Sequence, residues 1–265
     1  MPPAKKRVQR LRRYDSAKTR AAVLAQFGHV RNAVRTLPPE AFDKPTRLGE
    51  WTVRELVAHV SWMVDCVPRL LGRPEPARQE VALLDWPFVT AGTAEWIDRR
   101  TREVDASDPA ALMDRAGQAY EAAVAVAADE RLIPLGFGAM TLADFLVTRT
   151  VELVVHTDDL SAATGVEIPY DRQALAACTR LLADALAAKA PGGAVEVRIP
   201  PYAVVQCVEG PRHTRGTPPN VVETDPMTWI RLATGRAVWA AERDAARVSA
   251  SGERADLEGL LPLMS

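Results

Sequence analysis

The chain has 265 residues, of which 48 % are hydrophobic and 25 % charged, a balance typical of a soluble globular protein with one large or two medium domains. Its net charge of −1 excludes a general attraction to nucleic acid or to an anionic membrane, and no apolar run approaches the ~20 residues that a membrane-spanning helix needs. The three cysteines are far apart and lack CxxC spacing, which excludes a disulfide framework and favours a reducing cytoplasm.

Residues 1–15 are expected to form a basic N-terminal arm, in which KKRVQRLRR (5–13) is the main run of positive charge. Such a run could bind an anionic partner, but a solvated or frayed terminus is the favoured interpretation. No apolar segment follows the basic residues, so the sequence predicts no signal peptide.

Two long helices are expected next, the first over residues 16–36. The second begins at Thr52, because EWTVREL has the pattern of a capping box, in which Thr52 and Glu55 satisfy each other's backbone N–H groups. From Val53 onward, apolar residues recur at i, i+3, i+4 and i+7, the spacing of one helical face. This helix is expected to end near Gly72.

Two further helices, of which the second is long, and a loop follow. Residues 92–104 and 109–129 have helical patterning, and Asp108 stands before a proline at the first position of the second helix. The segment LIPLGFGAM (132–140) is rich in glycine and apolar residues. It could cover a site, but a plain connecting loop is the favoured interpretation.

A last long helix of this region covers residues 141–164 and closes at Gly165, a residue type common just past a helix end. It is the fourth long helix with an apolar face. Four such helices predict an antiparallel four-helix bundle over residues 16–170.

After residue 170 the pattern changes to short segments separated by turns. Helices are expected over 171–189 and 225–235, the second of which begins at the N-cap Asp225. Four segments have strand-like patterns: 194–199, 203–208, 236–241 and 247–253. The sequence therefore predicts a smaller α+β domain over residues 171–265.

The segment VELVVHTDDL (151–160) combines an apolar helix face with several ionisable side chains. At ~100° per residue, Glu152 and His156 lie in or beside the apolar stripe as i, i+4 neighbours. Arg149 also lies in the stripe. Asp159 lies at its edge, whereas Asp158 is expected to point to solvent. An isolated buried charge costs roughly several kcal/mol, so the inward groups must pair with one another or hold a cation.

A divalent metal would satisfy a carboxylate and a neutral imidazole together, but it needs a third ligand. His59, at the edge of the apolar face of the second helix, is the natural candidate. With Glu152 and His156 it would form a His₂Glu set with an open coordination position, as catalytic zinc sites require. In the alternative, Glu152 pairs with Arg149, and both histidines are hydrogen-bonded core residues. Spacing alone leaves both interpretations open.

Three segments resemble known families. TRLGEWTVRELVAHVSWMV (46–64) and VELVVHTDDLSAATG (151–165) resemble the two motifs of the DinB-like bundle in mycothiol-dependent maleylpyruvate isomerases. PPYAVVQCVEGPRHTRGTPPNVVETDPMTWIRLATG (200–235) resembles a bacterial sterol carrier protein-like domain, which is an α+β fold around an apolar groove. The resemblance implies the fold class α plus α+β, with a DinB-like antiparallel four-helix bundle before a smaller sterol carrier protein-like domain.

The resemblance also implies cofactors and site residues. His59, Glu152 and His156 match the family's metal ligands, which implies a divalent metal, with zinc favoured, and the small thiol mycothiol as cofactors. Asp159 matches the acidic residue that follows the metal histidine, and it is a candidate catalytic residue together with Arg149. Three residues of the loop GPRHTRG are candidates for binding an anionic substrate, since arginine's fork suits a carboxylate: Arg212, His213 and Arg215.

Under this resemblance the chain is expected to be a cytoplasmic isomerase or thiol S-transferase of a small electrophilic, maleylpyruvate-like acid. The thiolate adds to an activated double bond. Rotation and elimination then give the trans isomer, or the conjugate leaves. The competing hypothesis is a carrier that holds a lipid or other apolar ligand in the C-terminal groove, with the bundle metal structural or vestigial. The expected partners are a small thiol and a small acidic or apolar ligand, and the sequence predicts no particular oligomeric state.

Overall fold

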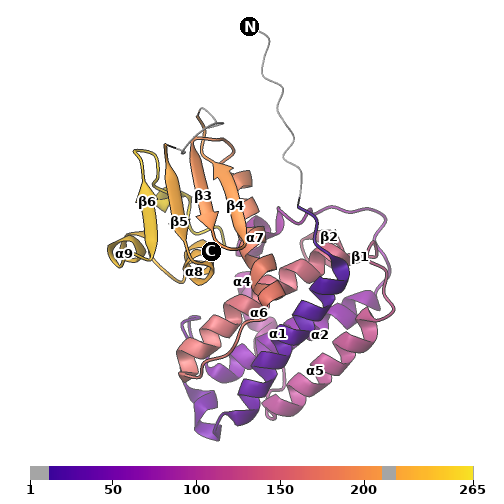
Figure 1. Ribbon diagram of the computed structural model, residues 1–265. Helices are drawn as coiled ribbons and strands as arrows, with labels where there is room; N and C mark the ends of the chain where they lie inside the picture. The colour runs from indigo at the N-terminus through magenta and orange to yellow at the C-terminus, as the bar shows by residue number, and fades with distance from the viewer. Residues whose placement is uncertain (1–11, 211–218, 265) are drawn as a thin grey trace.

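The computed structural model describes residues 12–210 and 219–264 (Figure 1). The predicted basic arm lies largely outside these residues, and three predicted substrate-binding residues lie entirely outside them: Arg212, His213 and Arg215. The described chain has a helical N-terminal part and a smaller C-terminal part of mixed helix and strand, which confirms the predicted fold class.

Four long helices form the N-terminal bundle: α1 (Ser16–Thr36), α2 (Val53–Leu71), α5 (Pro109–Val124) and α6 (Leu142–Thr164). Local capping explains where they begin and end. The Thr52 backbone N–H donates to the Glu55 carboxylate at 2.8 Å at the start of α2, as the capping box predicts. Gly165 ends α6 with a φ of 76°, in the left-handed region that glycine adopts without strain. Only α5 ends clearly earlier than predicted, at Val124 instead of residue 129.

Shorter elements connect these helices. The 3-10 helix η1 (Pro39–Asp43) precedes α2, and α3 (Trp86–Val89), η2 (Thr90–Thr93) and α4 (Ala94–Arg102) precede α5. Helix α4 corresponds to the helix predicted over 92–104, and it packs against α2. The segment that connects α2 to α5 in the chain therefore covers one side of the bundle through α4.

The predicted loop over 132–140 is instead an antiparallel hairpin of β1 (Leu132–Leu135) and β2 (Gly138–Thr141). The loop prediction was wrong because it treated the glycines as loop residues throughout. In the structure, residues 136–137 form a two-residue turn. Ile133 and Met140 pair across the hairpin and are buried against the bundle.

The C-terminal part is a four-stranded sheet in the order β4-β3-β5-β6, in which β3 and β5 are parallel and the other pairs antiparallel. Its strands are β3 (Val195–Ile199), β4 (Ala203–Cys207), β5 (Val221–Thr224) and β6 (Val248–Ser251). Helix α7 (Arg172–Lys189) packs against β4 and also against α1 and α6, so it joins the sheet to the bundle (Figure 1). The alternation predicted for β3 is present, with Val195, Val197 and Ile199 fully buried.

Two short helices and a 3-10 turn complete the C-terminal part: α8 (Pro226–Ala233), α9 (Trp239–Asp244) and η3 (Glu258–Leu260). The strand predicted over 236–241 is wrong, because Trp239 begins helix α9. Trp239 and Glu242 are spaced i, i+3 and are both buried on one side of this helix. A segment of six residues has too few apolar positions to distinguish the two-residue period of a strand from the 3.6-residue period of a helix.

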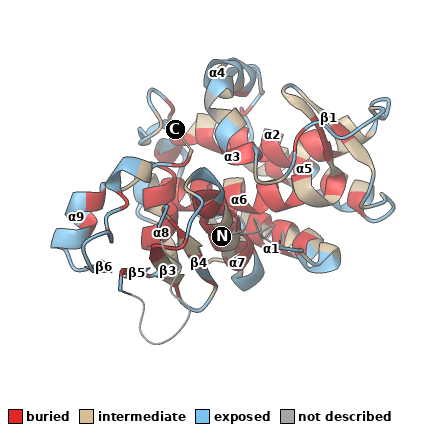
Figure 2. Ribbon diagram, turned by 90° about the horizontal axis from the view of Figure 1, so that it is seen from above, coloured by how far each residue is buried: buried red, intermediate tan, exposed pale blue. Residues whose placement is uncertain are grey.

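Helix α6 lies at the centre of the molecule, between the other bundle helices and α7 of the C-terminal part (Figures 1 and 2). It packs against α1, α2 and α7, and 16 of its 23 residues are buried. An ordinary surface helix buries only one stripe. Polar and charged side chains on α6 therefore need partners inside the protein.

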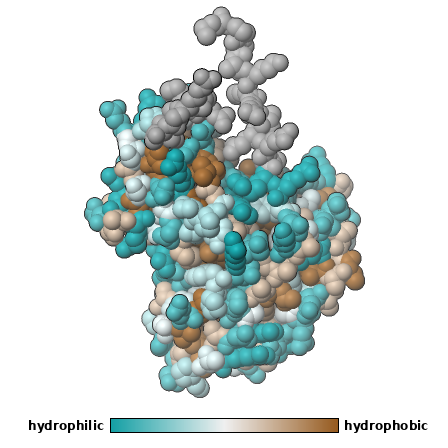
Figure 3. Space-filling model, viewed as in Figure 1, coloured by the Kyte–Doolittle hydropathy of each residue, from teal (hydrophilic) through white to brown (hydrophobic). Residues whose placement is uncertain are grey.

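The surface is mostly polar. On the face shown in Figure 3, hydrophilic residues predominate and hydrophobic ones form small separate patches. Within residues 12–210 and 219–264, no helix combines the length and apolarity needed to cross a bilayer.

Candidate metal centre

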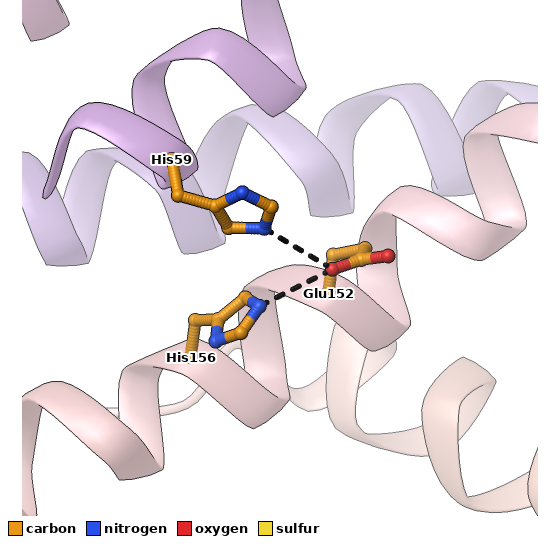
Figure 4. A group of neighbouring side chains, drawn as sticks. All are labelled: His59, Glu152 and His156. Atoms are coloured by element: carbon orange, nitrogen blue, oxygen red, sulfur yellow. Dashed lines mark ion pairs between the residues drawn. The ribbon is translucent and has the colours of Figure 1, made fainter. Parts of the chain in front are cut away.

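Two helices bring the three predicted metal ligands together. His59 lies on α2, and Glu152 and His156 lie one turn apart on α6 (Figure 4). One potential ligand atom from each residue lies within 4.8 Å of the other two. The Nε2 atoms of His59 and His156 are 3.6 Å and 3.3 Å from the same oxygen, Oε2 of Glu152. The three side chains therefore converge on one point from two distant parts of the sequence.

The second ring nitrogen of each histidine contacts a buried partner. His156 Nδ1 lies 2.9 Å from Asp159 Oδ2, and because a carboxylate only accepts, the proton on Nδ1 is donated to it. His59 Nδ1 lies 3.3 Å from the hydroxyl of Thr101, a residue of α4. These contacts orient both rings so that Nε2 faces the common point, as in carboxylate–histidine–zinc arrangements.

Burial and hydrogen bonding set the charges at this point. Burial lowers the pKa of His59 and favours the neutral ring that metals bind. Burial opposes the charge of Glu152, but the His156 and His59 rings, whose Nε2 atoms face its Oε2, outweigh burial and hold the Glu152 pKa well below its usual range. Burial also opposes a charged His156, yet its hydrogen bond to Asp159 and the nearby Glu152 carboxylate raise its pKa. A metal would therefore compete with a proton at His156.

This donor set fits a divalent metal such as zinc. Tetrahedral zinc binds histidine nitrogen and carboxylate oxygen at about 2.0–2.2 Å, which places neighbouring ligand atoms about 3.3–3.6 Å apart. The two distances from histidine Nε2 to Glu152 Oε2, 3.3 Å and 3.6 Å, match this spacing. Three protein ligands leave one position open, which is the arrangement of catalytic zinc sites.

Arg149, the predicted catalytic arginine, lies beside the three predicted ligands. Its guanidinium stacks over the Phe145 ring, 4.5 Å from the centroid, and donates to the Thr148 hydroxyl at 3.1 Å and 3.2 Å. Its Nη2 is 3.7 Å from Oε1 of Glu152, which is too long for a hydrogen bond but close enough for attraction. Glu152 therefore contacts both histidines and also lies near Arg149, so the Arg149 pairing predicted as an alternative occurs together with the histidine contacts.

Asp158 does not point to solvent, as the helical projection had predicted, because it is buried beside Asp159. Arg47, which precedes α2, forms ion pairs with both carboxylates. Arg231 pairs with Asp158 from 73 residues further along the chain. Arg236 pairs with Asp159 from 77 residues further along. The projection failed here because the C-terminal part covers this end of α6.

A row of aromatic rings also leads to His59. Its imidazole lies against Trp51 and Trp62, with ring centroids 5.1 Å and 6.0 Å away. Trp62 contacts Trp96 of α4 with centroids 5.6 Å apart, and Trp96 is 45 % exposed. The row therefore extends from the surface to a metal-ligand candidate. The sequence pattern did not indicate this row, because helical spacing does not distinguish a tryptophan beside a predicted metal ligand from one in the hydrophobic core.

The three cysteines lie outside the ligand set. All are buried with free thiols: Cys66, Cys178 and Cys207. Cys66 is on α2 like His59, but its Sγ contacts the Met63 carbonyl at 3.0 Å. Burial raises the pKa of the Cys66 thiol to about 11. Cys66 is therefore a protonated packing residue near pH 7.

The structure thus defines a class of protein in which a helical bundle holds a His₂Glu cluster and an α+β domain follows it. A family model described as the mycothiol maleylpyruvate isomerase N-terminal domain matches residues 23–161, more than half of the chain. The chain belongs to this family, as its two motifs predicted. A model described as the bacterial SCP ortholog matches residues 171–263. The predicted domain limits at residues 16–170 and 171–265 stay a prediction.

Solved structures show the same arrangement. Two of them are of the mycothiol-dependent maleylpyruvate isomerase, one as a histidine-to-alanine mutant, with TM-scores of 0.58 and 0.59 to this chain. Each is 15 % identical to this chain and covers 90 % of it, and the match spans 93 % of the solved chain. At this identity the likeness establishes the fold. No curated protein matches the chain.

Proposed function

We propose that the chain is a metal- and mycothiol-dependent isomerase or thiol S-transferase that acts on a small electrophilic acid of the maleylpyruvate type. The observation that carries the proposal is the convergence of His59, Glu152 and His156 on one point, within the segment that matches the family. Distances of 3.6 Å and 3.3 Å from the two histidine Nε2 atoms to Glu152 Oε2, together with an open coordination position, suit a catalytic metal, with zinc favoured.

The three side chains would hold the metal through the two Nε2 atoms and the Glu152 carboxylate. When bound, the metal supplies positive charge that keeps a thiol ionised near pH 7, and mycothiol supplies that thiol as the nucleophile. Cys66 does not take this role, because burial raises its pKa to about 11. A small-molecule thiol is therefore the nucleophile that suits the site, and its use fits the predicted reducing cytoplasm.

Arg149 is proposed to bind a carboxylate of the substrate. Its guanidinium is buried, and among the described residues only the Thr148 hydroxyl accepts a hydrogen bond from it. The remaining N–H groups of the planar fork suit a carboxylate. Asp159, proposed from the sequence as catalytic, instead contacts His156 and is assigned an orienting role. Binding of the same anion is also predicted for three residues outside the described chain: Arg212, His213 and Arg215.

The carrier hypothesis stays a prediction and gains no support from the sheet. A carrier needs an apolar groove for its ligand. The side of β3 that carries Val195, Val197 and Ile199 is fully buried within the core shared with α7. On the other side, Arg198 pairs with Glu196.

The test is turnover that requires both mycothiol and the metal ligands. Zinc-loaded protein is incubated with mycothiol and a panel of cis-dicarboxylates and other electrophilic acids, maleylpyruvate included. The proposal predicts trans isomer or thioether product from at least one compound, none without mycothiol, and none with Glu152→Ala. Equal turnover by wild type and Glu152→Ala would contradict it. So would bound lipid together with the absence of turnover across the panel.

A further inference from the structure

The Asp159 carboxylate connects the candidate metal centre to the C-terminal part. It is fully buried and accepts hydrogen bonds from three sides. His156 Nδ1 lies 2.9 Å from Oδ2. Arg236 donates through Nη2 to Oδ2 at 2.8 Å and through Nε to Oδ1 at 2.9 Å. Arg47 also donates to Oδ1. A carboxylate held this way has little freedom to rotate, so the ring that it contacts is fixed as well.

Arg236 is itself held in place. It follows α8 in the C-terminal part, and its Nη1 donates to the Thr234 carbonyl at 2.8 Å. Its side chain is mostly buried. The planar guanidinium therefore presents two parallel N–H groups to Asp159 in a fixed orientation, the geometry in which an arginine–carboxylate pair is most specific.

We infer that Arg236 is a positioning residue for the metal centre and that the C-terminal part completes the centre through the contacts Arg236–Asp159–His156. The inference rests on the proposed metal-binding function. Arg236 fixes the Asp159 carboxylate, Asp159 holds the proton of His156 on Nδ1, and His156 Nε2 is thereby presented to the metal. Outer contacts of this kind typically change metal affinity about 10–100-fold.

The structure offers a matched control on the neighbouring residue. Arg231 also comes from the C-terminal part and also forms a bidentate pair, with Asp158, at 2.6 Å and 3.0 Å. Asp158 adjoins Asp159 on α6, but the histidine contact is made by Asp159. Loss of either arginine removes one docking pair between the two parts of the chain. Of these two arginines, only Arg236 donates to Asp159, the carboxylate that contacts His156.

The experiment measures zinc affinity of the full chain by competition with a chromophoric chelator. We expect Arg236→Met to weaken zinc binding about tenfold, the lower end of the usual range, because Arg47 still holds Asp159. Arg231→Met is expected to change it less than about threefold, and Arg236→Lys to recover part of the loss. In cobalt-loaded protein, the visible bands should shift in Arg236→Met and stay unchanged in Arg231→Met.

Three outcomes would overturn the inference. Equal losses of zinc affinity in Arg236→Met and Arg231→Met would show that zinc binding depends only on the attachment of the C-terminal part to α6. Unchanged affinity and spectrum in Arg236→Met would remove its role. If wild type binds no zinc, the proposed metal centre fails, and this inference fails with it. Circular dichroism checks folding. If either methionine variant is unfolded, Arg236→Lys and Arg231→Lys are compared in the same way.

Discussion

The ion pair between Arg231 and Asp158 provides a quantitative test of how the C-terminal part docks on α6. The perturbation is a double-mutant cycle of Arg231→Met, Asp158→Asn and the double variant. The Asp158 side chain is 5 % exposed and that of Arg231 is 42 % exposed. Exposed pairs contribute roughly 0.2–1 kcal/mol, and breaking fully buried ones costs roughly 3–5 kcal/mol. A bidentate pair with one buried partner should therefore show a coupling free energy of about 1–2 kcal/mol.

The assay is urea unfolding of the four proteins at pH 7, followed by circular dichroism. A second cycle on Arg100 and Glu103, at the end of α4, is the control, because their side chains are 52 % and 53 % exposed. Its coupling free energy should be at most about 0.5 kcal/mol. High salt should reduce the control coupling more than that between Arg231 and Asp158.

The pH dependence of the coupling follows from the pKa of Asp158. Burial would raise this pKa, but hydrogen bonds from Arg231 and Arg47 outweigh burial and lower it. The pair therefore stabilises the fold fully above the ordinary aspartate pKa of about 3.9 and loses this contribution as the pH falls through the lowered value. A coupling free energy at pH 7 no larger than that of Arg100 and Glu103 would refute the docking described here.

Three further predictions concern the candidate metal centre and the buried cysteines. Arg149→Met should lower kcat/KM for an acidic substrate about 10–100-fold, the effect of a lost charged hydrogen bond; an equal loss with a neutral amide analogue would contradict carboxylate binding. Thr101→Val should weaken zinc binding about tenfold because His59 Nδ1 loses its partner, whereas Thr101→Ser, which keeps the hydroxyl, should bind as wild type does. Ellman's reagent at pH 8 should find no fast-reacting thiol in native protein and three after unfolding, since all three cysteines are buried. A fast-reacting Cys66 in the native protein would show that its thiol is accessible.

Local signals in the sequence predicted most of the bundle. The capping box of Thr52 and Glu55 and the stop at Gly165 are formed by neighbouring residues, so sequence determines them directly. The i, i+4 spacing likewise placed Glu152 beside His156 on one face of α6. The strand predicted over 236–241 failed because a six-residue helix has no comparable signal.

Contacts between distant segments could not be predicted in this way. The helical projection assigned Asp158 to solvent, because its partner Arg231 lies in the other part of the chain. Thr101 and Arg236 had no signal in the sequence either. Thr101 contacts His59, and Arg236 donates to Asp159, only once the chain has folded. The placement of His59 beside α6 came from family resemblance, which contains long-range information that spacing lacks.

The central claim is that His59, Glu152 and His156 bind a catalytic metal, and metal content tests it most directly. Purified full-length protein is loaded with zinc, freed of excess by gel filtration and analysed by plasma emission spectroscopy. The claim predicts one zinc per chain in wild type and almost none in folded His59→Ala, Glu152→Ala and His156→Ala. Metal-free wild type, or variants that retain as much zinc as wild type, would contradict it.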